Sequence, residues 1–76
     1  MKYETFRNIV LANADGKNIH RINGLLGVLK NSLSNRNYWK NRDKEKYLRL
    51  TNIAREAYKS LTTVSRVPCF MDEIEI

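Results

Sequence analysis

Two apolar seams constrain the fold of this 76-residue chain more than any other feature of its sequence. Their members step by three and four residues along two stretches, Ile19, Ile22, Leu26, Leu29 and Leu33 in the first, and Tyr47, Leu50, Ala54, Ala57, Leu61 and Val64 in the second. Such alternation lines up side chains along one side of an α-helix, as in helical bundles. Leu25 and Val28 widen the first seam into a stripe that can serve two neighbouring helices. The sequence therefore predicts an all-α fold.

A shorter apolar pattern precedes the seams, where Tyr3, Phe6, Ile9 and Val10 recur at helical spacing. The predicted helices cover about residues 2–13, 18–33 and 42–65. They can form a small three-helix bundle, or a helical hairpin that dimerises into a four-helix arrangement. The helical domain is expected over residues 1–66. A non-helical acidic and apolar tail is expected over residues 67–76, because Pro68 prevents the last helix from continuing.

Turn and capping residues suggest where the helices begin and end. Gly16 suits the left-handed residue that terminates a helix, while Asn18 and Asn41 suit the N-caps of the second and third helices. Gly24 and Gly27 lie inside the second helix, where each costs about 1 kcal/mol relative to alanine. They indicate either a close approach by another helix or a break.

The charge of the chain indicates a polyanionic partner. Its formal net charge is +6, and residues 1–71 carry fourteen basic and five acidic residues, a net charge of +9. A basic body favours nucleic acid or an acidic protein surface.

Basic and aromatic residues concentrate in the stretch RNYWKNRDKEKYLR, residues 36–49. We predict that residues 36–41 form a loop, so that the adjacent rings of Tyr38 and Trp39 do not share one face. In one interpretation, Trp39 closes the end of the core and Tyr38 is half exposed. In the other, Tyr38 or Trp39 stacks on the bases of a single strand, with flanking cations on its phosphates.

The outward face of the third helix could extend this surface. Its residues include Asn52, which could reach a base edge, and cations that could contact phosphates. The pairs Glu45–Arg49 and Glu56–Lys59 have the spacing of ion pairs on a helix and would suit an ordinary solvated face. The candidate nucleic-acid-binding residues are Arg36, Tyr38, Trp39, Lys40, Arg42, Lys46, Arg49, Asn52, Arg55 and Lys59.

Residues 8–25 offer a second candidate, a helix-turn-helix. Leu11, Ala12, Gly16, Ile22 and Leu25 fill five of its seven core positions, whereas Asp15 and Lys17 are polar where the motif is apolar. An ordinary helical hairpin with a glycine stop would give the same pattern. If the motif is formed, Asn18, His20, Arg21 and Asn23 would face the major groove.

Several classes of protein do not fit the sequence. One cysteine and one histidine allow no intrachain disulfide and indicate no zinc site. The sequence contains no phosphate-binding glycine loop, nucleophile elbow or paired-carboxylate constellation, so we expect neither an enzyme nor a bound cofactor or metal. No apolar run approaches the roughly 18–20 residues of a membrane span, and no signal peptide is recognisable, which favours a cytoplasmic protein without a membrane partner.

The sequence thus predicts a small basic regulatory protein that binds DNA or RNA without catalysis. The alternative is an inhibitor or adaptor that docks on an acidic surface of a host protein. The small size and the nine asparagines would suit a phage or mobile-element product in that case. A homodimer is compatible with either function.

Overall fold

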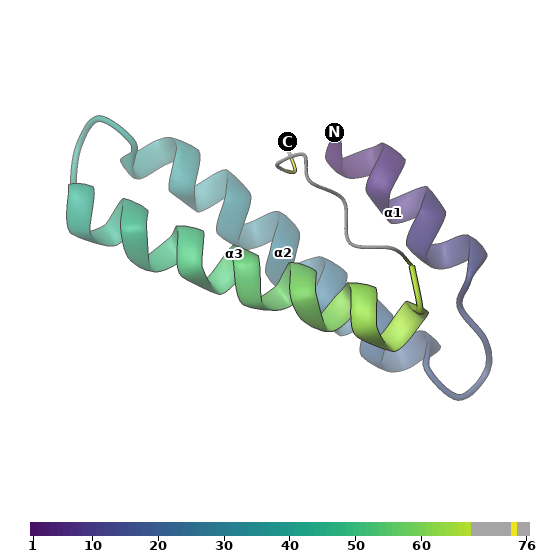
Figure 1. The fold of residues 1–76 in the computed structure, drawn as a ribbon. Coiled ribbons are helices and arrows are strands. Elements are labelled where there is room, and N and C mark those ends of the chain that lie inside the picture. Colours follow the sequence, from purple (N-terminus) through teal and green to yellow (C-terminus); the bar gives the residue numbers. More distant parts are fainter. Residues whose placement is uncertain (68–73, 75–76) are drawn as a thin grey trace.

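The computed structural model describes residues 1–67 and residue 74, and this part of the chain forms three helices and no strand. Helix α1 spans Tyr3–Ala12, α2 spans Ile19–Trp39 and α3 spans Lys44–Ser65. Helices α2 and α3 form a long antiparallel pair, and α1 packs against one side of it near the α1–α2 connection (Figure 1). The predicted all-α class is confirmed, with three helices. Most of the predicted tail, residues 68–73 and 75–76, lies outside the described residues.

The core forms where the three helices meet. Its largest fully buried side chains are Phe6 and Val10 of α1, Ile22 and Leu29 of α2, and Leu61 of α3. The two seams supply most of the remaining buried apolar residues, and Val67 and Ile74 join the same cluster from beyond α3. The seam prediction is therefore confirmed for its central members, which are Ile22, Leu26, Leu29, Leu33, Ala54, Ala57 and Leu61.

Small and hydroxyl-bearing residues line the buried side of α3 and one position of α2. Thr51 and Ser65 of α3 are buried, as is Ser32 of α2. Ser32 donates a hydrogen bond to the carbonyl of Val28 at 2.7 Å, and Thr51 donates to Tyr47 at 2.8 Å. Because each hydroxyl is satisfied within its own helix, it can be buried without an unpaired polar group.

Helix α1 is fixed to the long pair by two aromatic residues. The hydroxyl of Tyr3 donates to the backbone carbonyl of Leu26 in α2 at 3.2 Å. The ring of Phe6 lies 5.1 Å from that of Tyr58 in α3, centroid to centroid. Burial raises the pKa of Tyr3, and the charge of Arg7 opposes this effect. Both contacts are made on the same flank of the α2–α3 pair.

The predicted end of the second helix is wrong. Helix α2 continues six residues past Leu33 and ends at Trp39, so Arg36, Tyr38 and Trp39 belong to its last turns and not to a loop. Residues 31–35 include four serine and asparagine residues, which are unfavourable in a helix interior, but Ser32 is buried against the core and its hydroxyl bonds to its own helix. Tertiary packing thus overrides the local preference of these residues. The actual connection to α3 is residues 40–43.

Two predicted helix ends also differ from those observed, and a third has the predicted N-cap residue without its side-chain capping bond. Gly16 has no positive φ, and α1 ends earlier, with Asn13 at its C-cap. At the start of α2, Asn18 occupies the N-cap position but its side chain makes no capping hydrogen bond; the carboxylate of Asp15 instead accepts from the backbone N–H groups of Lys17 and Asn18, at 2.8 and 3.0 Å. Helix α3 is capped by Asp43 and not by Asn41.

The two glycines inside α2 neither break the helix nor admit a close neighbour. A Cβ atom added at Gly24 or Gly27 would meet nothing within 4 Å in the described part of the chain. Val28, which was expected to widen the buried stripe, is 45% exposed. The outer surface of α2 is therefore open around these three residues.

Candidate nucleic-acid interface

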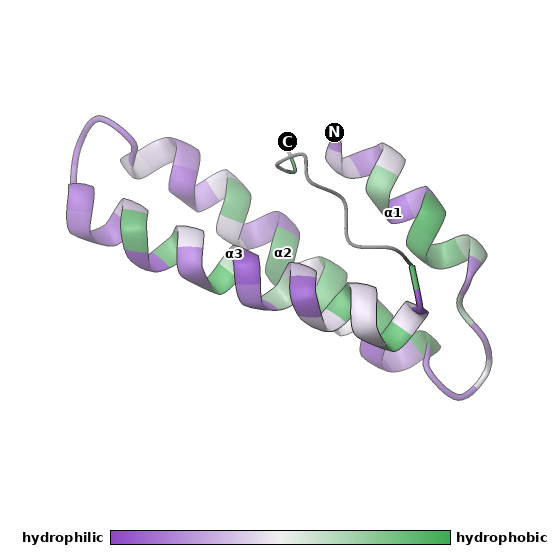
Figure 2. Ribbon diagram, viewed as in Figure 1, coloured by the Kyte–Doolittle hydropathy of each residue, from purple (hydrophilic) through white to green (hydrophobic). Residues whose placement is uncertain are grey.

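The basic stretch folds into the tip of the α2–α3 hairpin. Residues 36–46, which we call the hairpin tip, lie at the end of the molecule that projects beyond α1 (Figure 1). Figure 2 shows hydrophilic colours along the connection between the two helices. The hairpin tip carries two acidic residues, Asp43 and Glu45, and five basic ones, Arg36, Lys40, Arg42, Lys44 and Lys46.

Two of these cations lie over aromatic rings of the tip itself. The guanidinium carbon of Arg42 is 4.5 Å from the centroid of the Tyr38 ring, and Nζ of Lys46 is 4.1 Å from the centroid of the Trp39 ring. Both distances are within the roughly 6 Å range of cation–π attraction. The two rings meet edge to face, with centroids 4.8 Å apart and planes at 89°. We call Tyr38, Trp39, Arg42 and Lys46 the cation–ring cluster.

The aromatic residues of the cluster differ in exposure. Tyr38 is 56% exposed, whereas Trp39 is half-buried and meets a side chain from α3. The exposed Tyr38 is as the first interpretation expected, but Trp39 is not one of the described residues that pack against the core cluster, so closure of the core by Trp39 stays a prediction. The two rings were expected on different faces, because they are adjacent in sequence. On the last turn of α2 they nevertheless touch each other.

Arg36 is placed differently from the other cations of the tip. It is half-buried, and its guanidinium carbon lies 5.7 Å from the centroid of the Tyr47 ring on α3. Its Nε atom is buried and has no hydrogen-bond partner in the described part of the chain. Arg36 therefore connects α2 to α3, and it is less accessible to a phosphate than its exposed neighbours.

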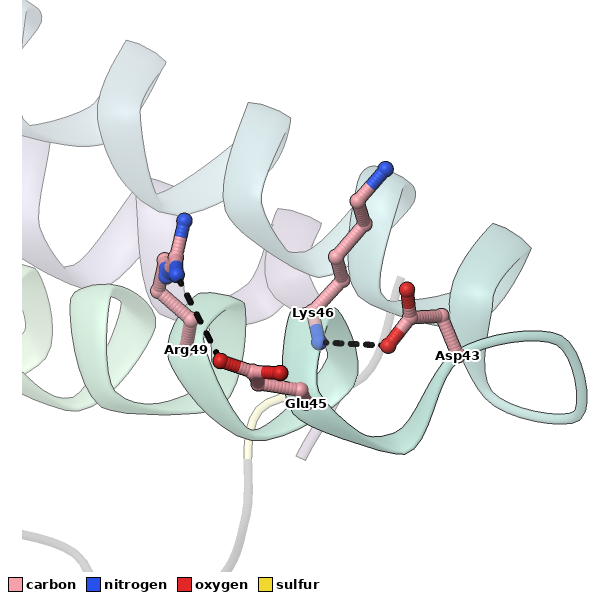
Figure 3. A network of polar contacts seen from close by, with 4 residues as sticks. All are labelled: Asp43, Glu45, Lys46 and Arg49. Atoms are coloured by element: carbon pink, nitrogen blue, oxygen red, sulfur yellow. Dashed lines mark hydrogen bonds and ion pairs between the residues drawn. The ribbon is translucent and has the colours of Figure 1, made fainter.

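Both acidic residues of the tip interact within α3 (Figure 3). The carboxylate of Asp43 accepts a hydrogen bond from the backbone N–H of Lys46 at 3.2 Å. Glu45 forms the predicted ion pair with Arg49, at 3.9 Å and largely exposed. No ion pair within the described part of the chain involves the four exposed cations of the tip, Lys40, Arg42, Lys44 and Lys46.

The basic surface of the tip is interrupted along the outward face of α3. Arg49, Asn52, Arg55 and Lys59 are exposed there, but Arg49 is paired with Glu45 of the tip, and Glu56 is exposed among the others. Arg55 follows Lys46 by nine residues, which places the two about half a turn apart around the helix. The other predicted pair, Glu56–Lys59, forms no ion pair in the structure described for these residues.

The structure therefore divides the ten predicted residues into two groups. Six come together at the hairpin tip, namely Arg36, Tyr38, Trp39, Lys40, Arg42 and Lys46. The other four, Arg49, Asn52, Arg55 and Lys59, follow along α3. The sequence prediction omitted Lys44, which is exposed at the first position of α3. Its position in the same basic run as Arg42 and Lys46 could have identified it.

The alternative helix-turn-helix gains little from the geometry. The connection between α1 and α2 has six residues, 13–18, longer than the three- to four-residue turn typical of the motif. Gly16 lacks the positive φ that was expected of it. Asn18, one of the residues expected to face the major groove, is half-buried and donates to the carbonyl of Val64 at 3.4 Å.

The described residues contain neither a membrane-spanning helix nor a cluster of metal ligands. None of the three helices is long and apolar enough to cross a membrane. Within the same residues, no group of three or more histidine, cysteine, aspartate or glutamate side chains is placed to hold a metal ion.

Comparison with known proteins gives no relative from which a function could be transferred. No protein-family model, curated protein or solved structure matches the chain significantly.

Proposed function

We propose that this protein binds nucleic acid, DNA or RNA, through the hairpin tip and without catalysing a reaction. The observation that carries the proposal is the set of four exposed cations at the tip, Lys40, Arg42, Lys44 and Lys46, which form no ion pairs with described residues. Phosphate contacts supply most of the affinity of sequence-independent nucleic-acid binding. A projecting cluster of unpaired cations has the charge and the accessibility that such contacts need.

The arrangement of the tip also favours binding over simple solvation. An exposed lysine or arginine normally loses side-chain entropy when it is fixed on a ligand. Arg42 and Lys46 already lie over Tyr38 and Trp39, so part of this freedom is lost before binding. The carboxylates of Asp43 and Glu45 stay charged, but five basic residues against these two acids leave the tip with a net charge of +3.

Two charge-matched double variants test the proposal. Arg42→Gln with Lys46→Gln removes two cations from the tip, and Lys2→Gln with Lys17→Gln removes two exposed cations far from it in the sequence. At about 50 mM salt, each lost phosphate contact should weaken binding on the order of tenfold. We expect the tip variant to bind labelled DNA and RNA far more weakly than the control, as measured by fluorescence anisotropy. Equal losses in the two variants would contradict a site at the tip.

An acidic protein partner is the second candidate, and an exposed apolar flank favours it. Val28 of α2 is 45% exposed and Ile53 of α3 is 41% exposed. Helix α1 contacts Leu26 and Lys30 of α2. Val28 is two residues from each of them, a rotation of about 200° around the helix, so it points to nearly the opposite side. Ile53 is likewise about 140° from Tyr58, the α3 residue that meets Phe6. Both apolar residues therefore lie on the flank opposite α1.

The charge of the chain selects among occupants of this flank. A second copy would bring two bodies of the same positive sign together, whereas an acidic protein would be attracted. Val28→Glu with Ile53→Glu should abolish capture of an acidic partner that survives nuclease treatment, and should leave nucleic-acid binding at the tip largely intact. Light scattering distinguishes a homodimer, because its mass would be twice 8.9 kDa. A dimer dissociated by the same variant would assign this flank to a second copy.

A further inference from the structure

We propose that the hairpin tip recognises the sugar–phosphate backbone and not the bases, and that Tyr38 and Trp39 are positioning residues for Arg42 and Lys46. This inference rests on the proposed function and specifies its ligand chemistry. The position of the two rings beside several cations had suggested base stacking. The inference assigns them a different role.

The orientation of the rings is unsuitable for a strand of stacked bases. Aromatic side chains that bind single strands present faces on which successive bases lie. Here the planes of Tyr38 and Trp39 are nearly perpendicular, at 89°, and the rings contact each other. Two neighbouring bases therefore cannot stack in parallel on the pair while this contact persists.

One face of each ring is also occupied from within the protein. Arg42 lies over Tyr38 and Lys46 lies over Trp39, both closer than the 5.7 Å and 6.0 Å that separate Arg36 from Tyr47 and Lys30 from Tyr3. Trp39 is in addition half-buried. A base could stack on the face of Trp39 that Lys46 covers only after Lys46 had moved, whereas a phosphate can bind the cation where it is.

A cation over a ring keeps its hydrogen-bond donors available to an anion. The donors of a guanidinium lie in its own plane, and those of an ammonium group point in several directions, so one ring contact leaves others free. Neither Arg42 nor Lys46 uses its charge in an ion pair within the described residues. The same two positions would thus meet phosphates of DNA or RNA, and of duplexes as readily as of single strands.

A base-free probe tests the inference directly. A labelled deoxythymidine strand, an abasic strand of the same length, and DNA and RNA duplexes are titrated with the full chain at one salt concentration. We expect the abasic strand to bind within about threefold of the deoxythymidine strand. A stacked base would instead make that difference about 5- to 150-fold. Trp39 is the only tryptophan, so its fluorescence reports stacking, and we expect deoxythymidine to quench it no more than the abasic strand does.

Two substitutions at Tyr38 test its positioning role. Tyr38→Leu removes the ring beneath Arg42 and should weaken binding of the abasic strand about two- to fivefold, whereas Tyr38→Phe keeps the ring and should bind like the parent. Tyr38 is exposed, and circular dichroism checks that both variants fold. The inference would be overturned if the abasic strand bound ten times more weakly than the deoxythymidine strand, or if Tyr38→Leu weakened binding of the deoxythymidine strand alone. Either result would leave the proposed function standing. Failure to bind any probe at low salt would overturn the proposed function itself.

Discussion

Removing the carboxylate of Asp43 should destabilise the start of α3 by about 1 kcal/mol. Asp43 has extended backbone angles, with φ −150° and ψ 104°, and its side chain accepts a hydrogen bond from the N–H of Lys46 at 3.2 Å. Replacing such an N-cap with alanine typically costs about 0.5–2 kcal/mol. The lost negative charge at the helix N-terminus adds about 0.3–1 kcal/mol at most. Asp43→Asn keeps an acceptor and should lose less than Asp43→Ala.

Urea unfolding followed by circular dichroism measures these differences. Asn41 supplies the control, because the sequence suggested it as the cap and the structure does not use it in that role. We expect Asn41→Ala to remain within about 0.5 kcal/mol of the parent. If Asn41→Ala destabilised the protein as much as Asp43→Ala, α3 would begin about two residues earlier and the reasoning would be refuted.

Three further predictions concern the fold. Gly24→Ala and Gly27→Ala should each stabilise the protein by up to about 1 kcal/mol, because both glycines lie in a helix interior with open space around them. Each variant should have a higher thermal midpoint than the parent; a lower midpoint would mean that another segment packs against these positions. Leu61→Ala should cost about 2–5 kcal/mol in urea unfolding, because Leu61 is fully buried, whereas Leu48→Ala, half exposed, should cost far less; equal costs would contradict the assigned core. Because the pKa of Tyr3 is raised in the folded protein, the stability that this residue contributes is retained below about pH 10 and is lost as the pH rises through the folded pKa. Tyr3→Phe should therefore lose less stability at alkaline pH in urea unfolding. An unchanged dependence of stability on pH in this variant would contradict the assigned role of Tyr3.

The sequence predicted the helices because their seams repeat at helical spacing. The central seam residues, such as Leu29 and Leu61, are buried as expected. The seam could not predict the last turns of α2, because its next position after Leu33 is Arg36 and is not apolar. That arginine continues the contact with α3 through the ring of Tyr47, a tertiary contact that periodicity does not reveal.

The candidate site was predictable in composition but not in geometry. The basic and aromatic run identified Arg42, Lys46, Tyr38 and Trp39. Which cation lies over which ring depends on α2 reaching Trp39 and on the four-residue turn that follows it. Charge counting also could not separate the tip from the outward face of α3. That separation follows from the half-turn between Lys46 and Arg55 around α3 and from the exposed Glu56 beside Arg55.

The salt dependence of binding tests the central claim most directly. The logarithm of the association constant for duplex DNA should fall linearly with the logarithm of the salt concentration, by about 0.9 for each phosphate contact. We predict that Arg42→Gln with Lys46→Gln lowers the magnitude of this slope by about 1.8, the value for two lost contacts. The charge-matched variant of Lys2 and Lys17 should keep the parent slope. Identical slopes for the parent and both variants would contradict a phosphate-binding site at the hairpin tip.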